Sequence, residues 1–250
     1  MSNGEKRLSI LGHLAELRRR LIRSVIAVGI TSAICFAFYE RIFDLLTGPA
    51  PTTISLTYIE MTEMIGTIMR VCLVGGVILA IPYLTYELMM FVSPALTRRE
   101  KRYVYLVLPW ITLMFAGGVV FAYYILIPRM AGFLFSFGSD IAVPQIRIGN
   151  YVSFVTRLLL TVGLVFEMPV VTAFLSWLGI LKPQWLADRR RAAIIVAFIL
   201  AAIITPTIDP LNQALVAAPL IVLYEMSIWL ARLVRKREPA VEKVVSSSTS

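Results

Sequence analysis

Two glutamates stand within clusters of basic residues. Glu16 lies in the stretch HLAELRRRL at 13–21, and Glu100 lies in FVSPALTRREKR at 91–102. A carboxylate can accept a two-pronged pair of hydrogen bonds from an arginine guanidinium, which the single ammonium of lysine cannot supply. On one shared surface, the two glutamates would suit a ligand with paired arginines. Each also has a simpler interpretation, in which Glu16 pairs with Arg19 or Arg20 about one helical turn later and Glu100 neutralises a basic loop.

A third glutamate, Glu167, lies inside an apolar run, in FEMP at 166–169. A charge at the centre of a bilayer costs at least about 2.5 kcal/mol. We therefore expect Glu167 to face protein or a wet cavity, or to be held protonated. The simpler alternative is a polar contact that holds helices together. Arg157 lies ten residues earlier, about 15 Å along a helix axis, which is too far for the two to pair.

The chain lacks the patterns that carry catalysis. It has no nucleophile beside a base, no phosphate-binding glycine loop and no metal-ligand spacing. Its only histidine is His13, and its two cysteines, Cys35 and Cys72, lie inside apolar runs as small core residues do. We expect no enzymatic activity, no cofactor and no metal site.

The composition is that of a membrane protein. Hydrophobic residues make up 58% of the chain and charged residues only 16%, where about 25% is usual for a soluble domain. The mean hydropathy is +0.81. The net charge of +9 comes from clusters between apolar runs rather than from one amphipathic face, so nucleic acid is not an expected partner.

Six apolar runs predict a single transmembrane domain over residues 1–234. The expected spans are 21–39, 65–90, 103–127, 151–177, 192–204 and 211–234. The fifth run is only about 20 Å long as a helix. With the sixth run it could also form a shallow hairpin that does not cross fully. Residues 235–250 are charged and then serine-rich, which is typical of a disordered tail.

Charge and turn residues refine this prediction. Most of the 24 Lys and Arg residues lie in four segments that six spans would place on one side, so we expect both termini in the cytoplasm. The pairs Gly75-Gly76 and Gly117-Gly118 would allow helices to approach closely. Asp209 is expected to cap the sixth helix, and Pro219 is expected to break it.

These motifs together resemble those of the TatC family, the receptor subunit of the twin-arginine protein translocase. The resemblance covers about residues 8–233. Four motifs carry it: HLAELRRRL at 13–21, FVSPALTRREKR at 91–102, FEMPVV at 166–171 and ITPTIDP at 204–210. Two weaker ones are TEMIGTIMR at 62–70 and NYVSFVTRLLLTVGLVFE at 150–167.

The resemblance implies an all-α integral membrane protein of the bacterial inner membrane. It would have six transmembrane helices, cytoplasmic termini and a concave shape with a short fifth and sixth helix. It would bind the Arg-Arg signal peptides of folded proteins and organise their export, driven by the proton-motive force. Its partners would be these signal peptides, single-span TatA- and TatB-type subunits and membrane lipids, in an oligomeric receptor complex.

The resemblance also assigns roles to individual residues. Six positions are implied to bind the signal peptide: Glu16, Arg18, Phe91, Pro94, Leu96 and Glu100. The intramembrane acid of the family falls on Glu167, and the acid of its outer turn falls on Asp209.

Two other functions fit part of the pattern. The first is a proton-coupled transporter of a small solute with Glu167 as the coupling group. Such a protein usually has discontinuous helices and an internal repeat, and the two halves of this chain show no convincing repeat. The second is a membrane scaffold in which Glu167 only fastens helices together.

Overall fold

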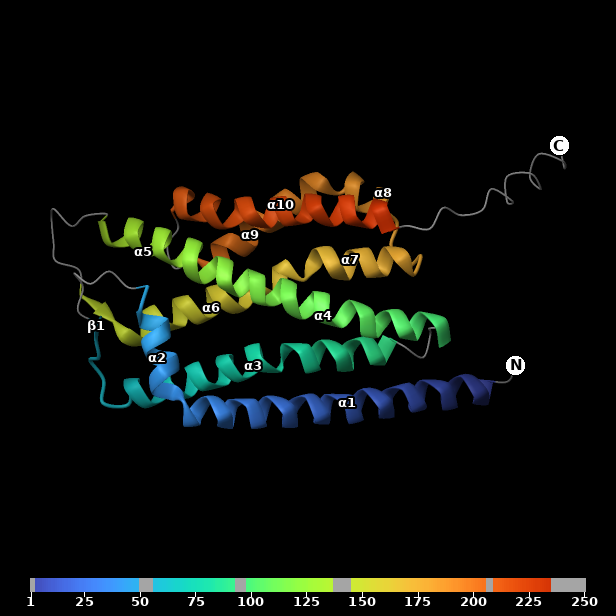
Figure 1. Cartoon of the computed structure of the whole chain (residues 1–250), viewed down its shortest axis with the longest axis horizontal. Helices are drawn as coiled ribbons and strands as arrows, with labels where there is room; N and C mark the ends of the chain where they lie inside the picture. Colours follow the sequence, from blue (N-terminus) through green and yellow to red (C-terminus); the bar gives the residue numbers. More distant parts are fainter. Residues whose placement is uncertain (1–2, 50–55, 93–97, 137–144, 206–208, 235–250) are drawn as a thin grey trace.

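The long helices run side by side along the long axis of the molecule (Figure 1). This computed structural model describes residues 3–49, 56–92, 98–136, 145–205 and 209–234. The helices of the first half are α1 (Asn3–Ala37), α2 (Tyr39–Thr47), α3 (Glu63–Val92), α4 (Arg98–Phe121), the π-helical turn η2 (Ala122–Leu126) and α5 (Ile127–Ser136). Those of the second half are α6 (Ile148–Phe166), α7 (Met168–Trp177), α8 (Pro183–Asp188), α9 (Arg190–Ile204) and α10 (Pro210–Val234).

Five helical stretches of the described chain are long and apolar enough to cross a membrane. They are Gly12–Ala37, Glu63–Phe91, Val107–Leu134, Ile148–Trp177 and Pro210–Val234. The expected class, a mostly helical membrane protein, is therefore confirmed. Helix α9 is not among the five, because its 15 residues make a helix only about 22 Å long. The expected number of six crossings stays a prediction.

The α1–α3 crossing depends on a glycine. The hydroxyl of Thr31 in α1 donates a hydrogen bond of 2.7 Å to the carbonyl oxygen of Gly76 in α3. A Cβ atom placed on Gly76 would collide with the backbone of Ser32, with its Cα only 2.7 Å away. The expected close-packing role of Gly75-Gly76 is therefore confirmed, because the two backbones touch where only glycine fits.

A methyl group at Gly76 is expected to destabilise the fold. We expect Gly76→Ala to lower the free energy of unfolding by about 1 to 3 kcal/mol, since the helices must move apart to admit it. The matched control is Gly117→Ala in α4, where an added Cβ meets no atom within 4 Å and should be neutral or slightly stabilising. Denaturant unfolding of both purified variants in detergent measures the difference. Equal effects at the two positions would contradict this account of the crossing.

The core is built around α6. Val152, Val155 and Leu158 of this helix are completely buried. Gly118 of α4 lies against Phe166, and Gly163 of α6 lies against Phe115, so each helix offers a glycine to an aromatic ring of the other. Small residues thus let α4 and α6 approach closely, which is how helices associate where lipid offers no hydrophobic drive.

Proline ends one helix of this bundle but not others. Helix α10 continues through Pro219, so the expected break there is wrong; α3 and α4 likewise continue through Pro82 and Pro109. Packing against neighbouring helices tolerates the lost hydrogen bond in such positions. In the fourth expected span, however, α6 ends at Phe166 and α7 begins at Met168, with Pro169 in the first turn of α7.

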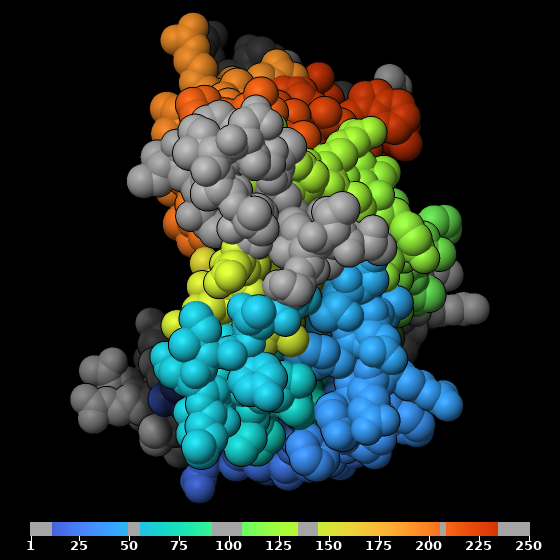
Figure 2. All heavy atoms as spheres, turned by 90° about the vertical axis from the view of Figure 1, so that its left-hand side faces the viewer, coloured from blue at the N-terminus to red at the C-terminus, as the bar shows by residue number. Residues whose placement is uncertain are grey.

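The end of the bundle opposite the start of α1 carries elements that the sequence did not predict. Helix α2 and the parallel pair of β1 (Leu56–Thr57) with β2 (Ile146–Arg147) lie there. The guanidinium of Arg147 lies 2.9 Å from Glu60 and 3.0 Å from Glu63, and the hydrogen bond to Glu63 contributes most to raising the pKa of Arg147. Figure 2 shows this end, where the outline is hollowed beside the beginning of α6 (yellow).

Candidate functional site

At the other end of the bundle, one arginine bridges two glutamates. Glu16 and Arg20 lie one turn apart on α1, and Nε and Nη2 of Arg20 lie 3.1 and 2.5 Å from Oε1 of Glu16. The remaining terminal nitrogen, Nη1, donates to Oε2 of Glu87 in α3 at 2.9 Å. The predicted pairing of Glu16 with an arginine one turn later is therefore confirmed, with Arg20 as the partner.

Glu87 is the buried member of this Glu16–Arg20–Glu87 bridge. Its side chain is only 4% exposed, whereas that of Glu16 is 33% exposed. The hydroxyl of Tyr83 donates to Oε1 of Glu87 at 2.8 Å, and Nη1 of Arg23 lies 3.9 Å from the same oxygen. A buried carboxylate is stable only when its oxygens are paired in this way.

A shallow pocket lies beside the bridge. Its lining comes from α1 and α3: Leu17, Arg20, Leu21, Ser24, Leu84, Glu87, Leu88 and Phe91. The ring of Phe91 also stacks on His13, with centroids 4.3 Å apart. The pocket therefore combines an apolar lining with a charged guanidinium, next to the half-buried carboxylate of Glu16.

The other residues implied to bind a signal peptide are placed unequally. Arg18 is exposed on α1, two residues from Glu16 and hence on a different face. Glu100 lies in the first turn of α4, and the start of α4 is at the same end of the bundle as the start of α1 (Figure 1). Pro94 and Leu96 lie outside the described residues. The structure thus places Phe91 in the pocket that Arg20, the partner of Glu16, also lines, and the pairing of Glu16 with Glu100 stays a prediction.

Sequence reasoning did not connect Glu87 to this site. The signal for it was present, since Glu87 is an acid near the inner end of an apolar run and Tyr83 precedes it by one turn. Its basic partner comes from 67 residues away. Which of the three consecutive arginines 18–20 reaches Glu87 depends on how α1 lies against α3. The sequence alone therefore could not identify Arg20 as the partner of Glu87.

Glu167 has no partner for its buried oxygen. It occupies the turn between α6 and α7, where its backbone carbonyl accepts from Val170 and Val171 at 3.1 and 3.0 Å. Its Oε1 atom is buried without a hydrogen bond to any described residue. A contact that fastens helices would need such a bond, so the described structure does not favour the helix-stapling interpretation.

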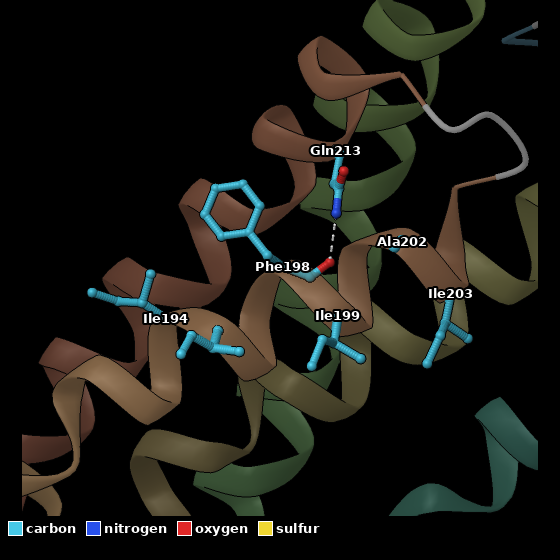
Figure 3. A pocket seen from close by; sticks show the side chains of 7 residues that line it. Ile194, Phe198, Ile199, Ala202, Ile203 and Gln213 are labelled. Carbon is cyan, nitrogen blue, oxygen red and sulfur yellow. Dashed lines mark hydrogen bonds between the residues drawn. The ribbon is translucent and has the colours of Figure 1, made fainter.

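Asp209 caps α10, as the sequence predicts. Its Oδ2 accepts the backbone N–H of Asn212 at 2.9 Å, and its carbonyl accepts the N–H of Gln213 at 3.0 Å. Figure 3 shows the amide of Gln213 reaching the carbonyl oxygen of Phe198 in α9, a hydrogen bond of 2.9 Å. The start of α10 is therefore fixed both by its own cap and by the neighbouring helix.

The cap yields a prediction that separates hydrogen bonding from charge. We expect Asp209→Ala to lower the free energy of unfolding by about 1 kcal/mol, because the N–H of Asn212 loses its acceptor. Asp209→Asn keeps an acceptor of the same shape and should unfold like the original chain. Chemical denaturation of the three proteins in one detergent measures this, and equal losses in both variants would show that the negative charge matters instead.

This fold and site define a multi-pass α-helical membrane protein with a buried arginine–carboxylate bridge at one end. The family model described as Sec-independent protein translocase protein (TatC) matches residues 12–219. The chain belongs to the TatC family, and it is a component of the Sec-independent protein translocase.

Individual relatives agree. The TatC protein of Carboxydothermus hydrogenoformans is 37% identical, over 96% of this chain and 99% of its own length. That of Desulforapulum autotrophicum is 38% identical, over 100% of this chain and 93% of its own. A crystal structure titled as the twin arginine translocase receptor TatC superposes with a TM-score of 0.81 at 37% identity, covering 89% of this chain and 99% of that one.

Proposed function

We propose that the chain is the receptor subunit that binds Arg-Arg signal peptides on the cytoplasmic side of the bacterial inner membrane. Glu16 and Glu100 would each accept one guanidinium group, with Phe91, Pro94, Leu96 and Arg18 around them. TatA- and TatB-type subunits would join it in an oligomeric complex, and the proton-motive force would drive export of the folded cargo.

The observation that carries this proposal is that Glu16 already binds a guanidinium group, that of Arg20 in the same helix. Two nitrogens of Arg20 lie 3.1 and 2.5 Å from one Glu16 oxygen, so the surroundings of this carboxylate admit an arginine fork. The other Glu16 oxygen is not used by Arg20, and the side chain remains one-third exposed. An arginine of the peptide would therefore find an accessible carboxylate oxygen on Glu16, in surroundings that already accommodate a guanidinium group.

Binding need not leave a charge unpaired. If a peptide arginine replaces Arg20 on Glu16, Arg20 keeps its hydrogen bond of 2.9 Å to Glu87. Stranding a buried charge would cost several kcal/mol, and this second carboxylate avoids that cost. The pocket lined by Leu17, Leu84 and Phe91 would meanwhile cover the aliphatic stem of the peptide arginine.

The orientation proposed for the chain rests on charge and on the fold. The start of α1, the start of α4 and the end of α10 lie at one end of the bundle (Figure 1). The basic stretch at 98–102 begins α4 there, and the basic stretch at 18–23 lies further along α1, where Arg20 meets Glu87 near the end of α3. By the positive-inside rule this end would face the cytoplasm. Residues 1–234 would form one domain of six spans with α9 as a short fifth span, and 235–250 a cytoplasmic tail.

One observation favours the alternative of a proton-coupled transporter. The α6–α7 helix pair is discontinuous at Glu167, whose Oε1 has no partner among the described residues, and transporters place such groups at midplane breaks. Uptake of a small solute into vesicles that contain this chain alone would support that function. Family membership favours the receptor.

The direct test of the receptor function is capture by peptide. A tagged Arg-Arg signal peptide, incubated with membranes that contain the full chain, should retain the chain on an affinity resin. The same peptide with Lys-Lys should retain much less, because lysine lacks the planar fork. Equal recovery with both peptides would contradict recognition by arginine forks.

A further inference from the structure

We propose that Arg70 and Arg157 together form a binding site for the phosphate headgroup of an anionic phospholipid. The site lies toward the end of the bundle opposite the Glu16–Arg20–Glu87 bridge, and it does not depend on the proposed receptor function.

The two arginines lie on one face of α6. Arg70 comes from α3, and its Nη1 donates a hydrogen bond to the hydroxyl of Ser153 in α6. Ser153 precedes Arg157 by one helical turn, so both lie on the same side of that helix. Nη1 of Arg157 in turn lies 3.4 Å from the carbonyl oxygen of Ile203 in α9. Residues from three helices thus hold two exposed arginines at neighbouring turns of one face of α6.

Neither arginine has a counter-charge among the described residues. Their acceptors, a serine hydroxyl and a backbone carbonyl, are neutral. Glu60 and Glu63, which lie just before and at the start of α3, are paired with Arg147. The arginines that do pair with carboxylates in the described chain are Arg20, Arg23, Arg147 and Arg190.

The depth of the pair makes a missing counter-charge costly. Arg70 lies seven residues after the start of α3, about 10 Å along its axis, and Arg157 lies nine residues after the start of α6, about 13 Å along. A cation inside an apolar span is unfavourable unless an anion or water reaches it. Two adjacent cations need this compensation more than one, because they also repel each other.

Helix α9 indicates why a lipid headgroup can reach this depth. Arg157 contacts Ile203, and α9 ends one residue later, at Ile204. The apolar surface that α9 offers to lipid therefore stops at the level of Arg157. Figure 2 shows the outline hollowed beside the beginning of α6 at this end. A headgroup next to the end of α9 would lie beside the two guanidinium groups rather than above them.

The surroundings favour a lipid over a peptide carboxylate. Ile199 and Ile203 are 53% and 61% exposed, and Figure 3 shows them pointing to the same side of α9. Acyl chains suit such an aliphatic surface. The phosphate above them can accept forked hydrogen bonds from both arginines.

The test is a lipid titration of the full chain in detergent, read by native mass spectrometry. Phosphatidylglycerol should bind the original chain more tightly than phosphatidylcholine does. Arg70→Gln/Arg157→Gln should weaken phosphatidylglycerol binding by about fivefold per arginine removed. The charge-conserving Arg70→Lys/Arg157→Lys variant should retain most of the preference, and the single Arg157→Gln variant serves if the double variant does not fold.

Arg129→Gln is the matched control. Arg129 is also an exposed arginine within an apolar span, on α5, and its loss should leave the preference unchanged. An equal loss in this control, or no loss in the double variant, would overturn the proposal. If the two lipids bind equally well, the arginines serve another anion, such as a partner carboxylate. If excess inorganic phosphate displaces phosphatidylglycerol, they serve a free anion. Either result would overturn the lipid site.

Discussion

Glu16→Gln is expected to weaken binding of an Arg-Arg signal peptide by about tenfold to a hundredfold. Hydrogen bonds to a charged acceptor are worth about 1.5 to 3 kcal/mol, and 1.4 kcal/mol is a factor of ten in affinity. The variant also leaves Glu87 as the only carboxylate that pairs with Arg20 in the described chain, so no charged acceptor remains at position 16 for an incoming guanidinium. Fluorescence anisotropy of a labelled peptide, titrated with the purified full chain in nanodiscs, measures this loss.

Glu225→Gln is the control for that experiment. Glu225 also accepts two hydrogen bonds from an arginine, Arg190, at 2.7 and 3.0 Å, so the variant removes the same charge from a comparable pair. It should leave peptide binding unchanged. A Lys-Lys peptide should bind weakly to every variant. If Glu16→Gln weakens the Arg-Arg and Lys-Lys peptides by the same factor, the fork mechanism is wrong.

The second large effect is on stability. We expect Glu87→Gln to lower the free energy of unfolding by about 3 kcal/mol, because it removes one partner of a buried charge pair. Glu225→Gln is again the matched control: that pair is about half exposed, and breaking an exposed pair should cost less than about 1 kcal/mol. Denaturant unfolding in detergent compares them.

A double variant tests whether the loss comes from the pair itself. Arg20→Gln/Glu87→Gln removes both charges, so no buried charge is left unpaired. Its free energy of unfolding should fall by less than the sum of the two single variants, which is the signature of direct coupling. Strict additivity would mean that Arg20 and Glu87 do not stabilise the fold through one another.

The features that the sequence predicted correctly are mostly local. Asp209 caps its helix because the acceptor and the donor lie three residues apart. Glu16 pairs with Arg20 for a similar reason, since i and i+4 meet on any helix. The Gly75-Gly76 pair signals a close approach without naming the partner, and only the fold identifies Ser32.

What the sequence could not predict depends on the arrangement of distant segments. Nothing local distinguishes Pro219, which a helix tolerates, from Pro169, which lies next to a break; the difference lies in packing against neighbouring helices. Helix α2 is not among the expected spans, because its nine residues are too short to cross a membrane. The role of Glu87 depends on α1 and α3 lying side by side, and Arg70 and Arg157 become a pair only when three helices meet.

The attachment of α1 has a mechanical consequence. This helix packs chiefly against α3 and leaves most of its remaining surface exposed. Any displacement of the end of α1 proposed to bind the peptide must therefore pass to the rest of the bundle chiefly through α3. Because α3 also reaches α6 through Arg70 and Ser153, one helix connects the two ends of the bundle, and stiffening or softening α3 should alter how strongly these ends are coupled.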